Sequence, residues 1–147
     1  MLKKRLTTAV AATSLAVALS ATAVAAGGPS ITTLKTKQSG NKVTVTIVTK
    51  NFKIDGKNVG KTPKAGRGHE HFAMDGGKYD FQKYSGANGK LAMQLGVQGK
   101  YSPSVTNAVT YTGLPKGKHK VTVYLVKNSH ANYANAGAKK TLTFTVR

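Results

Sequence analysis

A period of two in the apolar residues most restricts what this chain can fold into. Apolar side chains occupy every second position in residues 43–47, 121–125 and 142–146, with Thr or Tyr between them. Successive side chains of a β-strand point to opposite faces, so each segment is predicted to be a half-buried strand. Residues 31–37, 68–75 and 105–112 are weaker candidates for strands.

The segments between these strands are typical of turns and loops. Residues 55–66, 83–90 and 128–138 are rich in Gly, Asn, Lys and Pro. Residues 91–97 are ambiguous, but Gly89 and Gly96 argue against a long helix there. About seven short strands with frequent turns predict an all-β protein, specifically an immunoglobulin-like β-sandwich.

Residues 1–26 are predicted to be a cleaved signal peptide. Lys3, Lys4 and Arg5 precede an Ala-rich apolar run whose small terminal residues suit cleavage after Ala25 or Ala26. The Thr and Ser residues within the run disfavour the alternative, an uncleaved membrane anchor. Residues 27–147 then form a single secreted or cell-envelope domain without a transmembrane segment. The chain has no cysteine, so packing or a metal must replace disulfides.

The charge is strongly unbalanced, with 23 Lys and Arg against 4 Asp and Glu and a formal net charge of +19. Such a field attracts polyanions. Only three of the basic residues are Arg, and no stacked-aromatic pattern is present, so no specific nucleic-acid partner is expected. Anionic envelope polymers, lipid headgroups or polysaccharide are the expected partners, unless the lysines serve only to keep the protein soluble.

The histidines carry the clearest chemical signal. On a strand, His69 and His71 share a face with their Cα atoms about 6.5–7 Å apart, so both rings can reach one metal ion. Imidazole ligands suit Cu(II), Zn and Ni. The alternative is that both histidines point outward, because Phe72 and Met74 are in phase with the core, and only form hydrogen bonds there.

Strand order in an immunoglobulin-like sandwich adds a third histidine to this pair. Residues 68–75 would be the third strand and residues 118–127 the sixth, and these two are antiparallel neighbours in one sheet. His130 would then lie beside the first pair of histidines as a third ligand. At the other end, Asp75 would orient or pair with His119 as a supporting contact.

No sequence pattern indicates an enzyme. His-Glu-x-x-His and Gly-x-Ser-x-Gly are both absent. The four carboxylates of the chain leave little room for a paired general acid and base. We therefore expect a protein without catalytic residues.

Two segments resemble motifs of a group of small secreted bacterial β-sandwich proteins. Residues 66–76 match the strand Gly-x-Gly-His-x-His-x-x-x-Asp-Gly, and residues 114–125 match Leu-Pro-x-Gly-x-His-x-Val-x-Val-x-Leu, followed by a His. Ser129 replaces the acidic residue that usually precedes this His. The resemblance covers most of the mature chain and implies an extracellular or envelope domain without established catalysis. It maps the shared histidines onto His69, His71, His119 and His130.

These observations predict a secreted, non-catalytic β-sandwich that binds Cu or Zn through His69, His71 and His130. The alternative is a Lys-rich adhesive module that binds anionic wall polymers or polysaccharide through its charge.

Overall fold

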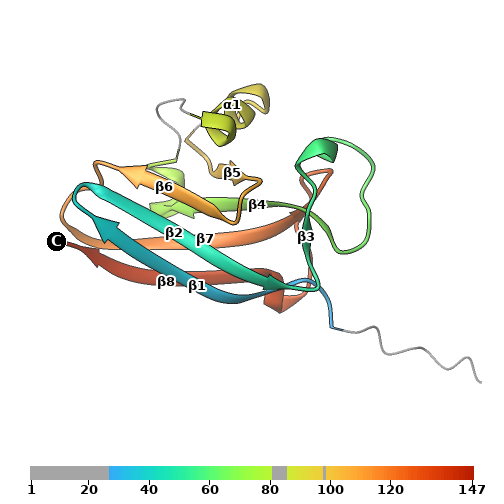
Figure 1. Cartoon of the computed structure of the whole chain (residues 1–147), viewed down its shortest axis with the longest axis horizontal. Helices are drawn as coiled ribbons and strands as arrows, with labels where there is room; N and C mark the ends of the chain where they lie inside the picture. Colours follow the sequence, from blue (N-terminus) through green and yellow to red (C-terminus); the bar gives the residue numbers. More distant parts are fainter. Residues whose placement is uncertain (1–26, 81–85, 98) are drawn as a thin grey trace, which may run out of the picture.

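The chain folds as two β-sheets that face each other (Figure 1). A computed structural model describes residues 27–80, 86–97 and 99–147, so the predicted signal peptide lies outside the described residues. The strands of the described part are β1 (Ser30–Ser39), β2 (Lys42–Lys50), β3 (Lys53–Ile54), β4 (Arg67–Met74), β5 (Ser102–Ser104), β6 (Ala108–Thr112), β7 (Gly117–Lys127) and β8 (Lys139–Val146). The helix α1 (Gly86–Gln94) lies beside β5, and short 3₁₀ turns cover Gly56–Asn58, Asp75–Gly77 and Ala136–Ala138.

The first sheet has three strands in the order β1-β2-β6, and the second has the order β3-β4-β7-β8 with β5 paired to β4. All pairs are antiparallel except β3 with β4. The prediction of an all-β class is therefore confirmed. In residues 27–80, 86–97 and 99–147, no helix has the length and apolar character needed to span a membrane.

One hydrophobic core lies between the two sheets, and the period of two supplies it. Alternate residues of β2, such as Val43 and Val45, face their counterparts on β4 and β7. The core includes Ile31, Val43, Val45, Ile47, Phe72, Met74, Val109, Tyr111, Val121, Val123, Leu125 and Val146. Burial of each such side chain stabilises the folded state by about 1.5–3 kcal/mol. Core packing can therefore stabilise this domain without a disulfide.

A buried carboxylate links the two sheets. Asp80 is fully buried and accepts hydrogen bonds from the Met74 backbone N–H, the Ser102 hydroxyl and the Tyr111 hydroxyl, each at 2.6 Å. Met74 belongs to β4 of the five-stranded sheet, whereas Tyr111 belongs to β6 of the three-stranded sheet. Since a buried carboxylate needs several donors, these three contacts account for the position of Asp80 in the interior.

The register between β4 and β7 sets the position of the histidines. Gly68 pairs with Lys127, and Met74 pairs with Val121 at the other end of the ladder. A Cβ atom at Gly68 would lie 1.8 Å from the carbonyl oxygen of Val126, so only glycine permits this close approach of the two strands. The prediction that these two segments are antiparallel neighbours is confirmed.

The secondary structure differs from the sequence prediction in two places. The segment predicted as one strand over residues 105–112 is a strand only in β6 (Ala108–Thr112), because residues 105–107 form a turn in which Asn107 has a φ of 57°. The nine-residue helix α1 (Gly86–Gln94) begins inside residues 83–90, which were predicted as a loop, and ends within the ambiguous residues 91–97, before Gly96. The loop prediction is therefore wrong for residues 86–90. The glycines limit this helix to between two and three turns but do not prevent it.

Candidate functional site

Two of the site histidines come from β4, and a tight turn after β7 brings in the third. His69 and His71 lie on the face of β4 that points away from the core, because Phe72 and Met74 occupy the core face. After β7 the chain reverses: the His130 N–H donates to the Lys127 carbonyl at 3.0 Å, and the Lys127 N–H donates to the Ala131 carbonyl at 2.8 Å. This reversal, with φ of 67° at His130, folds the turn back over the start of β4.

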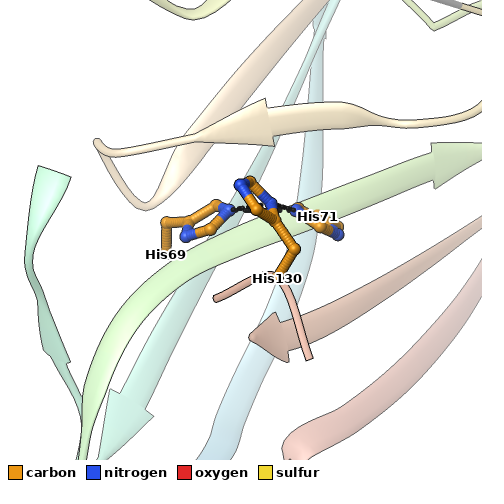
Figure 2. Close-up of side chains that lie close together, drawn as sticks. All are labelled: His69, His71 and His130. Atoms are coloured by element: carbon orange, nitrogen blue, oxygen red, sulfur yellow. Dashed lines mark hydrogen bonds between the residues drawn. The ribbon is translucent and has the colours of Figure 1, made fainter. Parts of the chain in front are cut away.

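Three ring nitrogens converge on one point in this cluster (Figure 2). The Nε2 atoms of His69 and His71 are 3.0 Å apart, and the Nδ1 atom of His130 lies 3.2 Å from the first and 3.5 Å from the second. A point equidistant from the three nitrogens lies about 1.9 Å from each. This spacing would let the three nitrogens serve as ligands of one Zn ion, whose usual Zn–N distance is about 2.0–2.1 Å.

The cluster is more enclosed than the sequence predicted. His69 is fully buried and His71 is 6 % exposed, whereas the sequence placed both on an outer sheet surface. The ring of Tyr101 stacks on His71 with 3.8 Å between the ring centroids, and the turn that carries His130 covers His69. The three histidines therefore form an enclosed centre above the sheet.

Burial keeps these histidines neutral at pH 7. Burial, together with the neighbouring His130, lowers the pKa of His69 to about 4. Burial and the other two histidines lower the pKa of His71 to about 2, and burial also lowers the pKa of His130. Neutral imidazole is the form that binds metal, so the site loses no protons when an ion enters near neutral pH.

The hydrogen bonding of the cluster is incomplete without a cation. A neutral imidazole carries one N–H, and three mutually close nitrogens cannot all be paired as donor with acceptor, so at least one contact brings together two lone pairs or two N–H groups. On the outer side, Nδ1 of His69 and Nε2 of His130 are buried without a partner among the described residues. A metal ion would take up the three central lone pairs and leave each outer nitrogen as the protonated one.

One side of the cluster opens to a shallow pocket of about 400 Å³. Its lining includes His71 and His130, together with Tyr101, Lys100 and Asn132. His69 does not line the pocket and closes the cluster from behind. An ion bound by the three histidines would have its remaining coordination position toward this pocket.

The fourth histidine lies at the other end of β4, in a separate contact. Asp75 accepts a hydrogen bond from Nδ1 of His119 at 2.6 Å and one from the Lys120 N–H at 2.7 Å. Nε2 of His119 lies 2.8 Å from the Pro115 carbonyl oxygen. Burial lowers the pKa of His119, but the bonds to Pro115 and Asp75 outweigh it and raise the pKa above its usual value.

This second contact is a structural pair and not part of the cluster of three histidines. Both ring nitrogens of His119 face oxygen acceptors, so the ring satisfies both contacts only when it is doubly protonated. A protonated imidazole cannot bind a metal. The pair instead closes the turn after β4 on to β7.

Sequence reasoning gave no role to Glu70, which lies between the two cluster histidines. Its side chain is fully buried on the core face of β4, and neither carboxylate oxygen has a hydrogen-bond partner within the part of the chain that the structure describes. Burial raises the pKa of Glu70 to about 8, which makes the neutral acid its main form at pH 7. The available signal was its phase, because Glu70 alternates with Phe72 and Met74 and therefore points into the core.

Comparisons with models of protein families, with curated proteins and with solved structures found no match for this chain. Fold and site together define a two-sheet β protein with a tri-histidine centre on the outer face of its larger sheet.

Proposed function

We propose that this protein is a metal-binding protein whose His69, His71 and His130 hold one Cu or Zn ion. The convergence of three neutral ring nitrogens within 3.0–3.5 Å of one another carries this proposal. Nitrogen-only ligation disfavours Ca²⁺ and Mg²⁺, which prefer oxygen, and favours Zn and Cu. The ion keeps its full positive charge, because no carboxylate of the described residues joins the cluster.

We propose that the protein is not an enzyme and that the ion serves binding or stability. This fits a centre in which Glu70, the nearest carboxylate in the sequence, points to the opposite face of β4. No described acidic side chain is then available beside the ion as a general base.

Calorimetric titration of residues 27–147, produced without a His tag, tests metal binding. Wild-type protein is expected to bind one equivalent of Zn or Cu(II). His130→Ala removes one ligand from a turn at the edge of the cluster and is expected to weaken binding by at least about a hundredfold. His119→Gln removes a histidine outside the cluster and is the matched control. Wild-type affinity weaker than about 1 mM would refute the proposal.

We also propose that the protein is secreted or held in the cell envelope, after removal of residues 1–26. The charged start and Ala-rich run of that segment support this location. Amino-terminal sequencing of the protein from the envelope and medium fractions is expected to begin at Ala26 or Gly27. Recovery of an intact Met1 chain from the cytoplasm would count against export.

The immunoglobulin-like assignment and the family resemblance belong to this proposal. The order β1-β2-β6 in one sheet and β4-β7-β8 in the other supports the immunoglobulin-like arrangement. The pair β4 and β7 corresponds to the predicted third and sixth strands. The two motif segments behind the resemblance contain the paired strands β4 and β7. We propose that both motifs exist to build this strand pair and its histidines.

A second candidate function is binding to anionic polymers. Its support is the exposure of lysines on the outer faces of both sheets, for example Lys35 and Lys37 on β1 and Lys118 and Lys120 on β7. Binding of this kind weakens as salt rises, because exposed charges are screened. Affinity for heparin-like resin that does not change with salt would exclude it.

A further inference from the structure

The pocket beside the cluster continues into a second depression on the outer face of the five-stranded sheet. The second depression has a volume of about 640 Å³ and shares Ala73, Gly76 and Tyr124 with the first. Its lining includes Ala73, whose side chain is a single methyl group, and Gly76, which has no side chain. We call the two depressions together the sheet groove; it runs from His71 and His130 toward Asp75 and Lys120.

The sheet groove is strongly cationic. Lys100 comes from the loop before β5, Lys120 from β7 and Lys139 from β8. Its one acidic lining residue is Asp75, which is already engaged with His119 and with the Lys120 N–H. Lysines from three separate elements therefore face one depression with no free carboxylate to balance them, which favours an anionic ligand.

The rest of the lining is hydroxyl-rich and aromatic. The hydroxyls of Thr122 and Thr141 lie 3.1 Å apart across β7 and β8, and Tyr124 lies beside them. The Lys139 ammonium already lies 5.2 Å from the Tyr124 ring centroid, and the Tyr101 ring already stacks on His71. Both rings thus have one face occupied, which leaves a poor platform for the stacking of successive nucleic-acid bases.

The length of the sheet groove suits a chain of several units. Tyr124 and Lys120 are four residues apart on β7, a span of about 13 Å, and the pocket at the histidines extends it further. A single small anion would fill only part of this space. An extended ligand with repeated acid groups could contact Lys100, Lys120 and Lys139 at once.

We propose that the sheet groove binds an acidic polysaccharide, one of whose carboxylates takes the open position of the metal ion. The hydroxyl and lysine lining matches the hydroxyl and carboxylate groups of such a polymer. The metal contact follows from His71 and His130, which belong both to the cluster and to the groove. This contact rests on the proposed metal binding, whereas binding along the lysines does not.

The test measures binding of an oligogalacturonate to residues 27–147 by fluorescence anisotropy, with neutral dextran as the blank. In metal-free protein, Lys120→Gln/Lys139→Gln is expected to weaken binding roughly three- to tenfold. Lys35→Gln/Lys37→Gln removes the same charge from exposed positions of β1 and is expected to change it less than about twofold. Equal losses in the two variants would show binding to overall charge and overturn the groove.

Two further arms separate the alternatives. Polyphosphate or single-stranded DNA that binds more tightly than the oligogalacturonate, with the same dependence on Lys120 and Lys139, would overturn the polysaccharide. Zn-loaded wild type is expected to bind the oligogalacturonate more tightly than metal-free protein, and His130→Ala to lose this gain. No gain with Zn would overturn the metal contact.

Failure of the groove and failure of the metal site can be told apart. If titration detects no metal but the metal-free protein binds the polymer through Lys120 and Lys139, the metal proposal is wrong and the groove stands. If metal binds but the polymer does not, the groove is wrong and the metal site stands.

Discussion

Replacing Val123 with threonine tests the strand register on which the whole site depends. Val123 is fully buried on β7, where it pairs with Phe72 of β4 on one side and Lys140 of β8 on the other. Threonine has nearly the same shape as valine, so the substitution opens no cavity. The added hydroxyl finds no free backbone partner, because β7 is hydrogen-bonded along both edges. A buried hydroxyl without a partner costs about 1–3 kcal/mol.

The expected loss should appear in thermal unfolding followed by circular dichroism. For a domain of this size, such a loss lowers Tm by roughly 4–12 °C. Thr122→Val is the matched control at the neighbouring position: Thr122 is partly exposed, and its hydroxyl meets that of Thr141 on the solvent side. It should change stability by less than about 0.5 kcal/mol. Equal losses at 122 and 123, or the opposite order, would refute the register and with it the position of the histidines.

Three further outcomes follow from the titratable groups and the cluster. The stability that the Asp75–His119 pair contributes should be complete below about pH 6.5 and be lost as pH rises through the raised pKa of His119. The urea unfolding midpoints of wild type and His119→Gln should therefore differ most near pH 6. A difference that grows toward pH 9 would contradict this. Glu70 keeps in the fold a proton that the unfolded chain releases above about pH 4.5. The stability of metal-free Glu70→Gln relative to wild type should therefore rise by roughly 3–4 kcal/mol between pH 5 and pH 8. A pH-independent difference in urea unfolding would show that Glu70 is ionised in the fold. Zn at a hundredfold excess over its Kd should add about 2.7 kcal/mol to unfolding at pH 7, and chelation with EDTA should remove it; calorimetric scans of His130→Ala should show no such gain.

Much of the fold could be predicted because its strands are half buried. In β2 and β8, apolar residues alternate with Thr, and this pattern indicates which face of each strand packs against the core. The proximity of His130 to His69 and His71 also followed from sequence, because strand order places the end of one strand beside the start of its neighbour. The order of the strands in the sheet is enough to bring the three histidines together.

The enclosure of the cluster could not be predicted, because it depends on contacts between distant segments. Tyr101 reaches His71 through β5, a three-residue strand whose pairing with β4 has no pattern in the sequence. The tight reversal after Lys127 depends on the positive φ of His130, a conformation that histidine adopts more often than most residues but that composition does not reveal. Burial of the histidines, and hence their low pKa values, is a product of these two contacts.

The cost of the metal-free cluster is itself an argument for metal binding. A fold without disulfides places three neutral imidazoles with converging nitrogens in a largely buried site. It also buries Glu70, which has no hydrogen-bond partner among the described residues, on the opposite face of β4. His69, Glu70 and His130 each bury a polar atom that gains no partner among the described residues, which opposes folding. An ion that binds only the folded protein would meet ligands that are already in position and already neutral. Its binding free energy would therefore offset the unfavourable free energy of burying these groups. The same three buried histidines that lower the stability of the metal-free protein should therefore make its free energy of unfolding depend strongly on Zn or Cu.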